Sequence, residues 1–461
     1  MAENTNRKAE IQRRRMLETP IAKIVTITAI PTVFQQLISV LYNLVDTYFV
    51  SQISYSAGAA VSAVFSLVSL TNAFMFGISM GAKGLISRRL GAGKVEEAHV
   101  ISSTAMAMEL TIGLLFAVFG LLYLQPILRF FGASETMMPH AMAYARFILM
   151  GVPIHCADAA LSCNLTGQGK TLYNMLAFGI ASLANIVLDY LFVIKLSMGA
   201  GGAALATIIG QAISLGILLW ALLSGKSAVK IHPKYVSKRL HTYFEITHNG
   251  IATVFRQGSA ALGTTLLNRL ANPYGDAAFA AIGYANKVYL MCRNLILGFG
   301  QGFQPVAGYN YSAGRPDRVK KAFGFSCLVG TGLCILSACG LALFPEEIIG
   351  LFRKDTEVVT TGAMMLRYYA LVLPLLAYST FVNQMYQCLG FSLWATVLAC
   401  CRQGIFFVPL LYLLHHGFGL TGLTLAQPAA DLATFLACIG FQIWFFKKVL
   451  REDAPLHAKR G

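Results

Sequence analysis

Charged residues are scarce in this sequence. Only 12% of its 461 residues are Asp, Glu, Lys or Arg, whereas 56% are hydrophobic and the mean hydropathy is +0.62. A soluble domain is about 45–50% apolar, so a water-soluble fold of this size could not bury so much apolar surface. Apolar runs of roughly 20 or more residues recur along the chain, and each can cross a hydrocarbon core of ~30 Å. The composition therefore excludes a soluble globular protein and indicates an all-α integral membrane protein.

The sequence also lacks the motifs of several enzyme classes. It contains neither a GxxxxGK[ST] phosphate loop nor an HExxH metal-binding helix. Its ten cysteines form no CxxC pair and no Cys/His cluster at zinc spacing. ATP-driven transport and membrane proteolysis lose support accordingly, and we expect neither an enzyme nor a cofactor.

Acidic residues are few beside the basic ones, with 20 Asp and Glu against 36 Lys and Arg and a formal net charge of +16. In a soluble protein this excess would suggest nucleic-acid binding. Here the basic residues fall in alternate connections between apolar runs, which the positive-inside rule places in the cytoplasm. We therefore expect no nucleic-acid partner. We expect a multi-pass protein of the bacterial cytoplasmic (plasma) membrane with both termini cytoplasmic.

The apolar runs predict twelve transmembrane helices in two lobes of six. Their predicted ranges are 20–51, 56–84, 97–123, 137–163, 171–195, 200–223, 243–271, 276–303, 319–344, 360–389, 392–414 and 419–447. The predicted domains are a basic cytoplasmic N-terminus (1–19), an N-lobe (20–223), a cytoplasmic linker (224–242), a C-lobe (243–447) and a cytoplasmic tail (448–461).

The second half of the chain repeats features of the first half at a spacing of 221 positions (298 − 77). The aligned pairs include Gly77 with Gly298, Gly81 with Gly302, Gly93 with Gly314 and Pro153 with Pro374. Each half has six predicted helices, an even number, so both halves have the same orientation in the membrane. Their pseudo-twofold axis then runs along the membrane normal, as in transporters whose two bundles rock about a site between them. The repeat favours a transporter over a channel or a membrane enzyme.

Acidic side chains inside the predicted helices are unevenly distributed. The first half holds four and the second half one: Asp46, Glu109, Asp158, Asp189 and Asp431. At 1.5 Å per residue, Asp46, Asp189 and Thr207 lie at a similar depth, within ~10 Å of the outer surface. Asn185 lies one helical turn from Asp189. Charged groups at membrane depth are usually functional, so these oxygen donors suggest a site for Na⁺ or a shared proton. Alternatively, they only hold helices together.

The helix that carries Asp46 contains three further residues of interest. Pro31 lies in its middle, where the missing N–H and the ring should kink or weaken the helix. Such a kink could bend when Asp46 changes charge, or it could be static. Gln36 and Asn43 lie on or near the face of Asp46 and are candidate cavity residues.

Other polar residues allow two interpretations. His155 and Asp158 share a face of one predicted helix and could form either a proton relay or a buried ion pair. In the second half, four polar residues within predicted helices are interpreted as structural: Arg256, Gln257, Lys287 and Arg293.

Several stretches, taken together and in order, resemble the multidrug and toxic compound extrusion (MATE) family, in the branch with MepA-like and DinF-like exporters. They are LYNLVDTYFV with Asp46, GISMGAKGLISRRLGAGKVEEA, NIVLDY with Asn185 and Asp189, and GGAALAT with Thr207. The resemblance covers nearly the whole chain. It implies that Asp46 works with Asn185, Asp189 and Thr207 in cation coupling and that Pro31 bends the first helix. Another branch has acids in the seventh and tenth helices, but none occurs here at 247–272 or 366–389.

The resemblance implies secondary active multidrug efflux by a rocker-switch mechanism, with cationic or amphipathic organic compounds exported in exchange for H⁺ or Na⁺. The expected partners are small drug-like molecules and the lipid bilayer, and the expected state is a monomer. One alternative is a lipid-linked saccharide flippase of similar architecture, which should show additional helices or a strongly cationic central cavity. A membrane-embedded enzyme or a scaffold is another.

Overall fold

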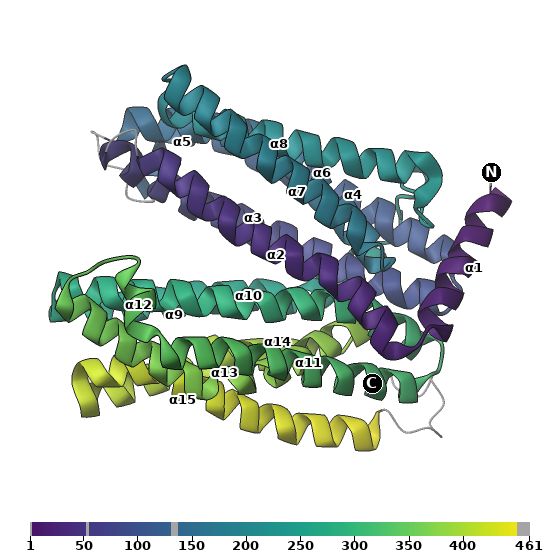
Figure 1. Cartoon of the computed structure of the whole chain (residues 1–461). Coiled ribbons are helices and arrows are strands. Elements are labelled where there is room, and N and C mark those ends of the chain that lie inside the picture. Colours follow the sequence, from purple (N-terminus) through teal and green to yellow (C-terminus); the bar gives the residue numbers. More distant parts are fainter. Residues whose placement is uncertain (1, 52–54, 131–136, 450–461) are drawn as a thin grey trace. The chain divides into compact units, whose positions relative to one another are not determined.

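The structure, a computed structural model, describes residues 2–51, 55–130 and 137–449 (Figure 1). Within these ranges the secondary structure is helical and contains no strand. The all-α fold expected from the apolar runs is therefore confirmed.

Each of the twelve predicted membrane helices corresponds to helical structure. In the first half they are α2 (Ile21–Ser51), α3 (Tyr55–Gly91), α4 (Val95–Leu122), α6 (Met138–Gly167), α7 (Thr171–Asp189) with π-helix η1 (Tyr190–Lys195), and α8 (Gly199–Ala221) with π-helix η2 (Leu222–Lys226). In the second half they are α9 (Leu240–Ala271), α10 (Asp276–Ser312), α11 (Pro316–Leu343), α13 (Thr356–Leu389), α14 (Ser392–Cys400) with π-helix η5 (Cys401–Ile405), and α15 (Phe407–Lys448). Gly419, with φ 56° and ψ −129°, breaks α15 between the last two predicted helices.

Five short elements accompany these long helices. They are α1 (Ala2–Glu18), α5 (Leu124–Phe130), α12 (Pro345–Gly350) and the 3₁₀ turns η3 (Pro233–Tyr235) and η4 (Asn272–Tyr274). The segment that forms α1 was predicted only to be a basic N-terminus.

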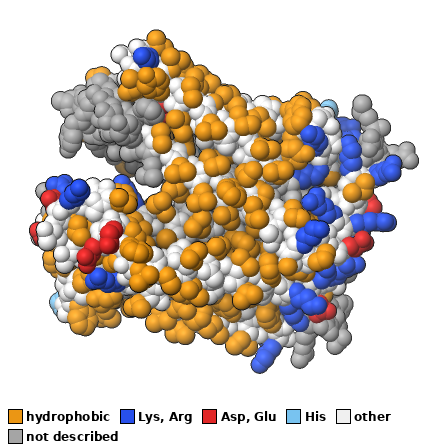
Figure 2. Space-filling model, viewed as in Figure 1, with side chains coloured by type: hydrophobic (Ala, Val, Ile, Leu, Met, Phe, Trp, Pro, Cys, Tyr) orange, Lys and Arg blue, Asp and Glu red, His pale blue; other side chains and the backbone are white. Residues whose placement is uncertain are grey.

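The long helices have the lengths that a bilayer requires. In the described part of the chain, eight segments qualify as membrane spans by length and hydropathy. The last segment, residues 392–448, is long enough at 1.5 Å per residue for two crossings. The more polar helices α3, α9 and α10 contain 37, 32 and 37 residues, which is also sufficient. Figure 2 shows hydrophobic side chains along the helices and basic side chains gathered at helix ends. The chain is a multi-pass membrane protein.

Contacts divide the chain into two compact units. Unit 1 comprises Met1–Glu18 and Ile30–Gly250, and unit 2 comprises Thr19–Ala29 and Ile251–Gly461. Helix α2 therefore begins in unit 2 and continues in unit 1, whereas α9 begins in unit 1 and continues in unit 2. The predicted lobes do not include this exchange of helix starts, and their boundaries stay a prediction.

Close backbone contacts explain why the helix starts are exchanged. In unit 1, an ideal Cβ added to Gly250 of α9 would lie only 1.8 Å from the Gly77 carbonyl oxygen, and one added to Gly81 would lie 2.1 Å from a carbonyl oxygen of α9. In unit 2, a Cβ on Gly302 of α10 would lie 2.3 Å from Cα of Ala29 in α2. Small residues permit such close helix crossings in membranes. Gly81 and Gly302 are 221 positions apart (302 − 81), as are Ala29 and Gly250 (250 − 29).

The turns between helices repeat at the same spacing. Gly93 and Gly314 have φ values of 77° and 75°, and Gly169 and Gly390 have values of 76° and 93°. Each pair is separated by 221 positions (314 − 93 and 390 − 169). The left-handed backbone conformation at these helix ends favours glycine because other residues carry a Cβ. The repeat predicted from the sequence is therefore present in the backbone of each unit.

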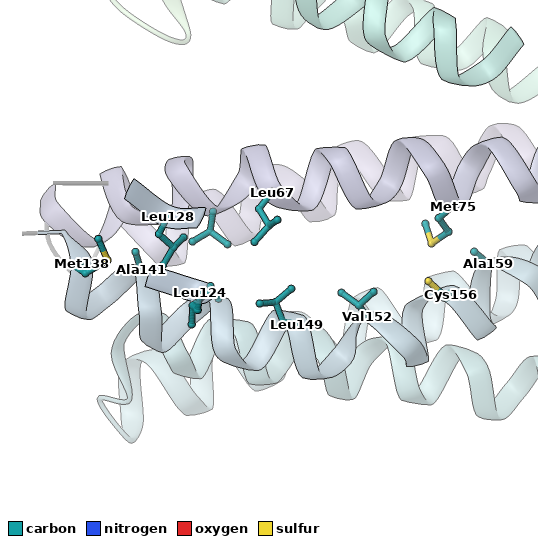
Figure 3. Packing of buried hydrophobic residues seen from close by; sticks show 12 residues of the cluster. Leu67, Met75, Leu124, Leu128, Met138, Ala141, Leu149, Val152, Cys156 and Ala159 are labelled. Atoms are coloured by element: carbon teal, nitrogen blue, oxygen red, sulfur yellow. The ribbon is translucent and has the colours of Figure 1, made fainter. Parts of the chain in front are cut away.

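An apolar core holds one end of unit 1 together. Figure 3 shows Leu67 and Met75 of α3, Leu128 of α5, and Leu149 and Val152 of α6 directed toward one another. All five side chains are buried. Since lipid tails are as apolar as these residues, close packing rather than removal from water stabilises this core.

Helix α1 binds to the ends of three other helices in unit 1. Its side chains donate to main-chain carbonyls: Lys8 Nζ to Gly225 O at 2.6 Å, Gln12 Nε2 to Gln168 O at 2.8 Å, and Arg13 Nε to Gly91 O at 2.8 Å. The three acceptors lie at the C-terminal ends of η2, α6 and α3. The last carbonyls of a helix lack partners within it and carry partial negative charge, so these donors stabilise all three ends.

The predicted linker also packs on unit 1. Its backbone N–H groups donate to side chains in the first turns of α4: Lys230 N to His99 Nδ1 at 3.2 Å, His232 N to Ser103 Oγ at 3.1 Å, and Ser237 N to Thr104 Oγ1 at 2.9 Å. Gln168, fully buried after α6, accepts from Ala228 N–H through Oε1 at 2.7 Å and donates from Nε2 to Ser227 Oγ at 2.9 Å. The connection between the two halves is therefore part of unit 1.

We expect Gln168→Leu to destabilise the protein by about 1–3 kcal/mol, because the Ala228 N–H would lose its acceptor while remaining buried. Thermal unfolding of the detergent-purified protein, followed by tryptophan fluorescence, should show a Tm lower by roughly 2–6 °C. Gln211→Leu is the matched control, since Gln211 is half-buried on α8 and forms no hydrogen bond among the described residues. Equal Tm values for the two variants would contradict this prediction.

Candidate functional site

Two polar side chains are buried near the end of α7. Asn185 is 2% exposed, and Asp189, one turn later, is fully buried. Neither Nδ2 nor Oδ1 of Asn185 has a hydrogen-bond partner in the described part of the chain. Helix α7 ends at Asp189, where the backbone changes to the π-helical turns of η1. Such turns often occur at functional sites. A buried amide without partners is expensive, so these residues suggest a site for a ligand.

Helix α8 brings Thr207 toward this pair. An ideal Cβ on Gly210 would lie 3.3 Å from Cβ of Asn185, so the two helices approach closely at this point. Because α7 and α8 run antiparallel, Thr207, one turn before Gly210, lies level with the segment from Asn185 to Asp189. Thr207 Oγ1 donates to Ala203 O at 3.1 Å, which leaves its lone pairs available as acceptors. The structure therefore groups three of the four residues of the predicted coupling site.

The remaining predicted residues of this site lie on α2. The side chains of Asp46 and Asn43 lie outside those that the structure describes, although both backbones belong to α2. Pro31 is buried within the same helix, which is continuous through it, and Gln36 is half-buried. The predicted kink at Pro31 stays a prediction.

A second polar cluster lies inside unit 1. Glu109 of α4 is fully buried, and its Oε1 accepts a hydrogen bond of 2.5 Å from Ser79 Oγ of α3. Its Oε2 has no hydrogen-bond partner within the described ranges. Asp158 of α6 lies within electrostatic reach of Glu109, and Ser214 of α8 lies beside Asp158. Four helices thus place two carboxyl groups and two hydroxyls in the interior of the unit.

Unit 1 contains two further polar residues of interest, His155 and Lys83. The buried Nδ1 of His155 has no hydrogen-bond partner, and no ion pair between His155 and Asp158 occurs among the described residues. The proton relay that the sequence suggested stays a prediction. Lys83, which is 3% exposed, was not among the predicted residues. The predicted helix ended at residue 84 and placed it at a helix end, whereas α3 continues to Gly91.

Among the described residues of unit 2, one carboxylate is buried, and both of its oxygens have partners. Asp431 is 3% exposed and pairs through Oδ1 with Arg402 Nε at 2.7 Å. Gln427 Nε2 donates to the same oxygen at 2.8 Å, and Tyr289 OH donates to Oδ2. Arg402 Nη2 in turn donates to Tyr289 OH at 2.5 Å. These contacts join η5, α10 and α15.

Three arginines line one cavity in unit 2. They are Arg256 of α9, Arg293 of α10 and Arg402 of η5, and the volume of the cavity is about 50 Å³. None of the described residues that line it is acidic. Arg256 and Arg293 were predicted to be structural, and Arg402 was not among the predicted residues. The presence of all three inside predicted helices marked them as charged residues at membrane depth, but it could not show that they meet.

Known proteins resemble this chain along most of its length. The sequence model of the MatE family matches residues 31–191 and 253–413. An FAD transporter of Shewanella oneidensis is 22% identical over 92% of this chain and 95% of that protein. The multidrug export protein MepA of Staphylococcus haemolyticus is 25% identical over 91% and 93%. The outward-facing structure of a multidrug resistance MATE family transporter has a TM-score of 0.89 at 23% identity, covering 94% of this chain and 98% of that one. The family resemblance predicted from the motifs is confirmed.

Proposed function

This chain belongs to the MatE family, and on that premise we propose that it is a secondary active transporter that exports small organic compounds in exchange for H⁺ or Na⁺. The name of MepA from Staphylococcus haemolyticus, a multidrug export protein, supports efflux as the activity. The proposed cargo includes cationic or amphipathic drug-like molecules, and transport requires neither a catalytic reaction nor a cofactor. Both termini are proposed to face the cytoplasm. The relatives named above give a lipid-linked saccharide flippase no support.

The observation that carries the coupling proposal is the buried amide of Asn185, which has no hydrogen bond among the described residues and lies one turn from the buried Asp189. With Thr207 at the same level and Asp46 on α2, the set offers carboxylate, amide and hydroxyl oxygens. Hard oxygen donors of this kind bind small cations, and a carboxylate can bind a proton instead. We assign cation coupling to Asp46, Asn185, Asp189 and Thr207.

Coupling requires that ion and drug favour different states of the protein. In the outward-open state, H⁺ or Na⁺ reaches Asp46 and Asp189 and neutralises the acidic pocket. Neutralisation weakens the hold on a cationic drug, which leaves to the outside. Helix α2 passes from unit 2 into unit 1 between Ala29 and Ile30, one residue before Pro31. A bend at Pro31 would therefore act where the chain passes from one unit to the other.

Proteoliposomes with separately imposed gradients test this proposal. A pH gradient or a Na⁺ gradient should drive accumulation of a cationic dye such as ethidium, and collapse of that gradient by an ionophore should abolish it. The gradient that drives uptake identifies the coupling ion. Absence of uptake under both gradients, with folded protein in the membrane, would refute ion-coupled export.

We expect Asn185→Ala to lower ion-driven dye uptake by about fivefold or more, in line with coupling free energies of 1–3 kcal/mol. Its Tm should change little, because the Asn185 side chain forms no hydrogen bond among the described residues that the substitution could break. Uptake and thermal unfolding are measured on the same preparation. A large fall in Tm with unchanged uptake would show that Asn185 is structural.

A further inference from the structure

The arginine-lined cavity of unit 2 contains positive charge that has no partner in the described part of the chain. Of its three arginines, only Arg402 is paired among the residues that the structure describes, with Asp431 and Tyr289. The Nε of Arg293 is buried and has no hydrogen-bond partner in the described ranges. Arg256 forms neither an ion pair nor a hydrogen bond with any described residue. Arginines that only stabilise helix packing would be expected to donate to neighbouring carbonyls or acids, as Arg402 does.

The charges of this cavity do not balance. Three guanidinium groups face one carboxylate, Asp431, which leaves a formal charge of +2. The positive charges of the three arginines interact with one another, so the three side chains belong to one site rather than to separate pockets. Concentrating like charge inside a membrane protein is expensive, and Asp and Arg at this depth are usually found with a partner or at a functional site. A negatively charged ligand would supply the missing partner.

The remaining lining of the cavity is partly polar and partly apolar. Amide and hydroxyl groups of Gln257, Gln384 and Thr434 border the cavity, and Leu297 and Leu398 add apolar surface. The Oε1 atom of Gln384 is buried without a hydrogen-bond partner in the described part of the chain. The cavity volume of about 50 Å³ suits a phosphate or carboxylate group, whereas sites that enclose a whole drug-sized molecule occupy about 300–1,000 Å³. The cavity can therefore hold the anionic group of a ligand, with Leu297 and Leu398 as apolar contacts beside it.

We propose that this cavity binds organic anions and that Arg256 and Arg293 hold the phosphate or carboxylate group of the ligand. The planar guanidinium group donates two parallel hydrogen bonds to either group, which makes arginine suited to both. Arg402, fixed by Asp431 and Tyr289, adds the third positive charge. The binding site stands on the geometry alone, whereas the identification of the anion as cargo rests on the proposed transport function.

Isothermal titration calorimetry on the full-length protein in detergent tests the site with three probes that share one ring system. These are 1-naphthyl phosphate, 1-naphthoate and 1-naphthylmethylammonium. The two anions should bind and the cation should bind at least about tenfold more weakly. Arg256→Gln and Arg293→Gln should each weaken binding of the phosphate by about tenfold to a hundredfold, the contribution of a charge-assisted hydrogen bond.

Arg269→Gln is the matched control, because Arg269 is exposed on the same helix as Arg256 and does not line the cavity. It should bind 1-naphthyl phosphate as the unmodified protein does. Should a glutamine variant fail to fold, Arg293→Lys retains the charge but not the paired donors, and it should weaken binding by about threefold or more. Equal affinity of the protein and its cavity variants for the phosphate, or preference for the cation, would overturn the proposal.

Competition identifies the source of the anion. Displacement of 1-naphthyl phosphate by inorganic phosphate supports a site for soluble anions. Displacement only by phosphatidic acid in mixed micelles, with phosphatidylcholine as the control, supports a site for lipid headgroups. Failure of both competitors to displace it overturns the assignment of a phosphate site.

Transport is then measured separately from binding. If no imposed gradient drives uptake of any probe while arginine-dependent binding persists, ion-coupled export fails and the anion site stands. If ethidium is transported but 1-naphthyl phosphate does not bind, the anion site fails and ion-coupled export stands.

Discussion

Replacement of Asp189 by asparagine is expected to reduce ion-driven efflux by at least about tenfold. Asp189 is fully buried at the end of α7, level with Thr207 and one turn from Asn185. An asparagine at this position keeps the size of the side chain but can neither take up a proton at neutral pH nor provide a negative charge for Na⁺. The variant loses the interaction that distinguishes the ion-bound state from the ion-free state. Such an interaction typically contributes a coupling free energy of about 1–3 kcal/mol, which corresponds to a change in affinity of about 5–150-fold. Uptake of ethidium by proteoliposomes measures the effect.

The control for this variant is Asp355→Asn, which makes the same chemical change at an exposed position outside the membrane spans. It should transport normally. Glu109→Gln separates the two acidic clusters of unit 1, since Glu109 belongs to the cluster with Ser79 and Asp158. Undiminished efflux by Asp189→Asn would exclude Asp189 from coupling. The same loss in Glu109→Gln would extend the site to the second cluster.

Gly250→Val is expected to abolish recovery of folded protein from the membrane. Its Cβ would have to lie 1.8 Å from the Gly77 carbonyl oxygen, and a backbone atom cannot turn away as a flexible side chain can. Overpacking of a core by side-chain atoms alone costs typically 1–3 kcal/mol. In Gly250→Val the helices α3 and α9 would have to separate, so the loss of stability should be larger than this. Size-exclusion chromatography of a fluorescent fusion, with and without heating, measures the yield of folded protein and its Tm.

Gly258→Val provides the matched control on the same helix. A Cβ at Gly258 would meet no atom within 4 Å, so this variant should fold with a nearly unchanged yield. Gly302→Val, the counterpart of Gly81→Val in the repeat, should fail as Gly250→Val does, because a Cβ there would strike the backbone of Ala29. Normal yield from Gly250→Val would show that the crossing of α3 and α9 can open.

The sequence predicted the long helices well because bilayer thickness imposes their length. It failed where a helix extends beyond its apolar run. Helix α3 continues past residue 84 to Gly91 through Arg88 and Arg89, and the basic segment before residue 19 folds into α1 because its side chains reach carbonyls at the ends of other helices. Such interactions depend on tertiary contacts that no local apolar pattern contains.

The candidate sites were predictable to different degrees. Asn185, Asp189 and Thr207 could be grouped because depth along a helix follows directly from its rise per residue. The cavity of Arg256, Arg293 and Arg402 could not be predicted in the same way. These residues come from three helices, and their convergence depends on the rotation of each helix about its own axis. Depth gives no information about that rotation.

The exchange of helix starts makes each half of the chain depend on the other half for folding. A cut within the 224–242 connection would leave the first fragment without the opening turns of α9 and the second without those of α2. The first fragment would contain the opening turns of α2, which pack in unit 2, and the second would contain those of α9, which pack in unit 1. Neither should fold alone, whereas the two produced in one cell should reconstitute the protein. In this respect the chain resembles a domain-swapped dimer whose two copies have been joined into one polypeptide.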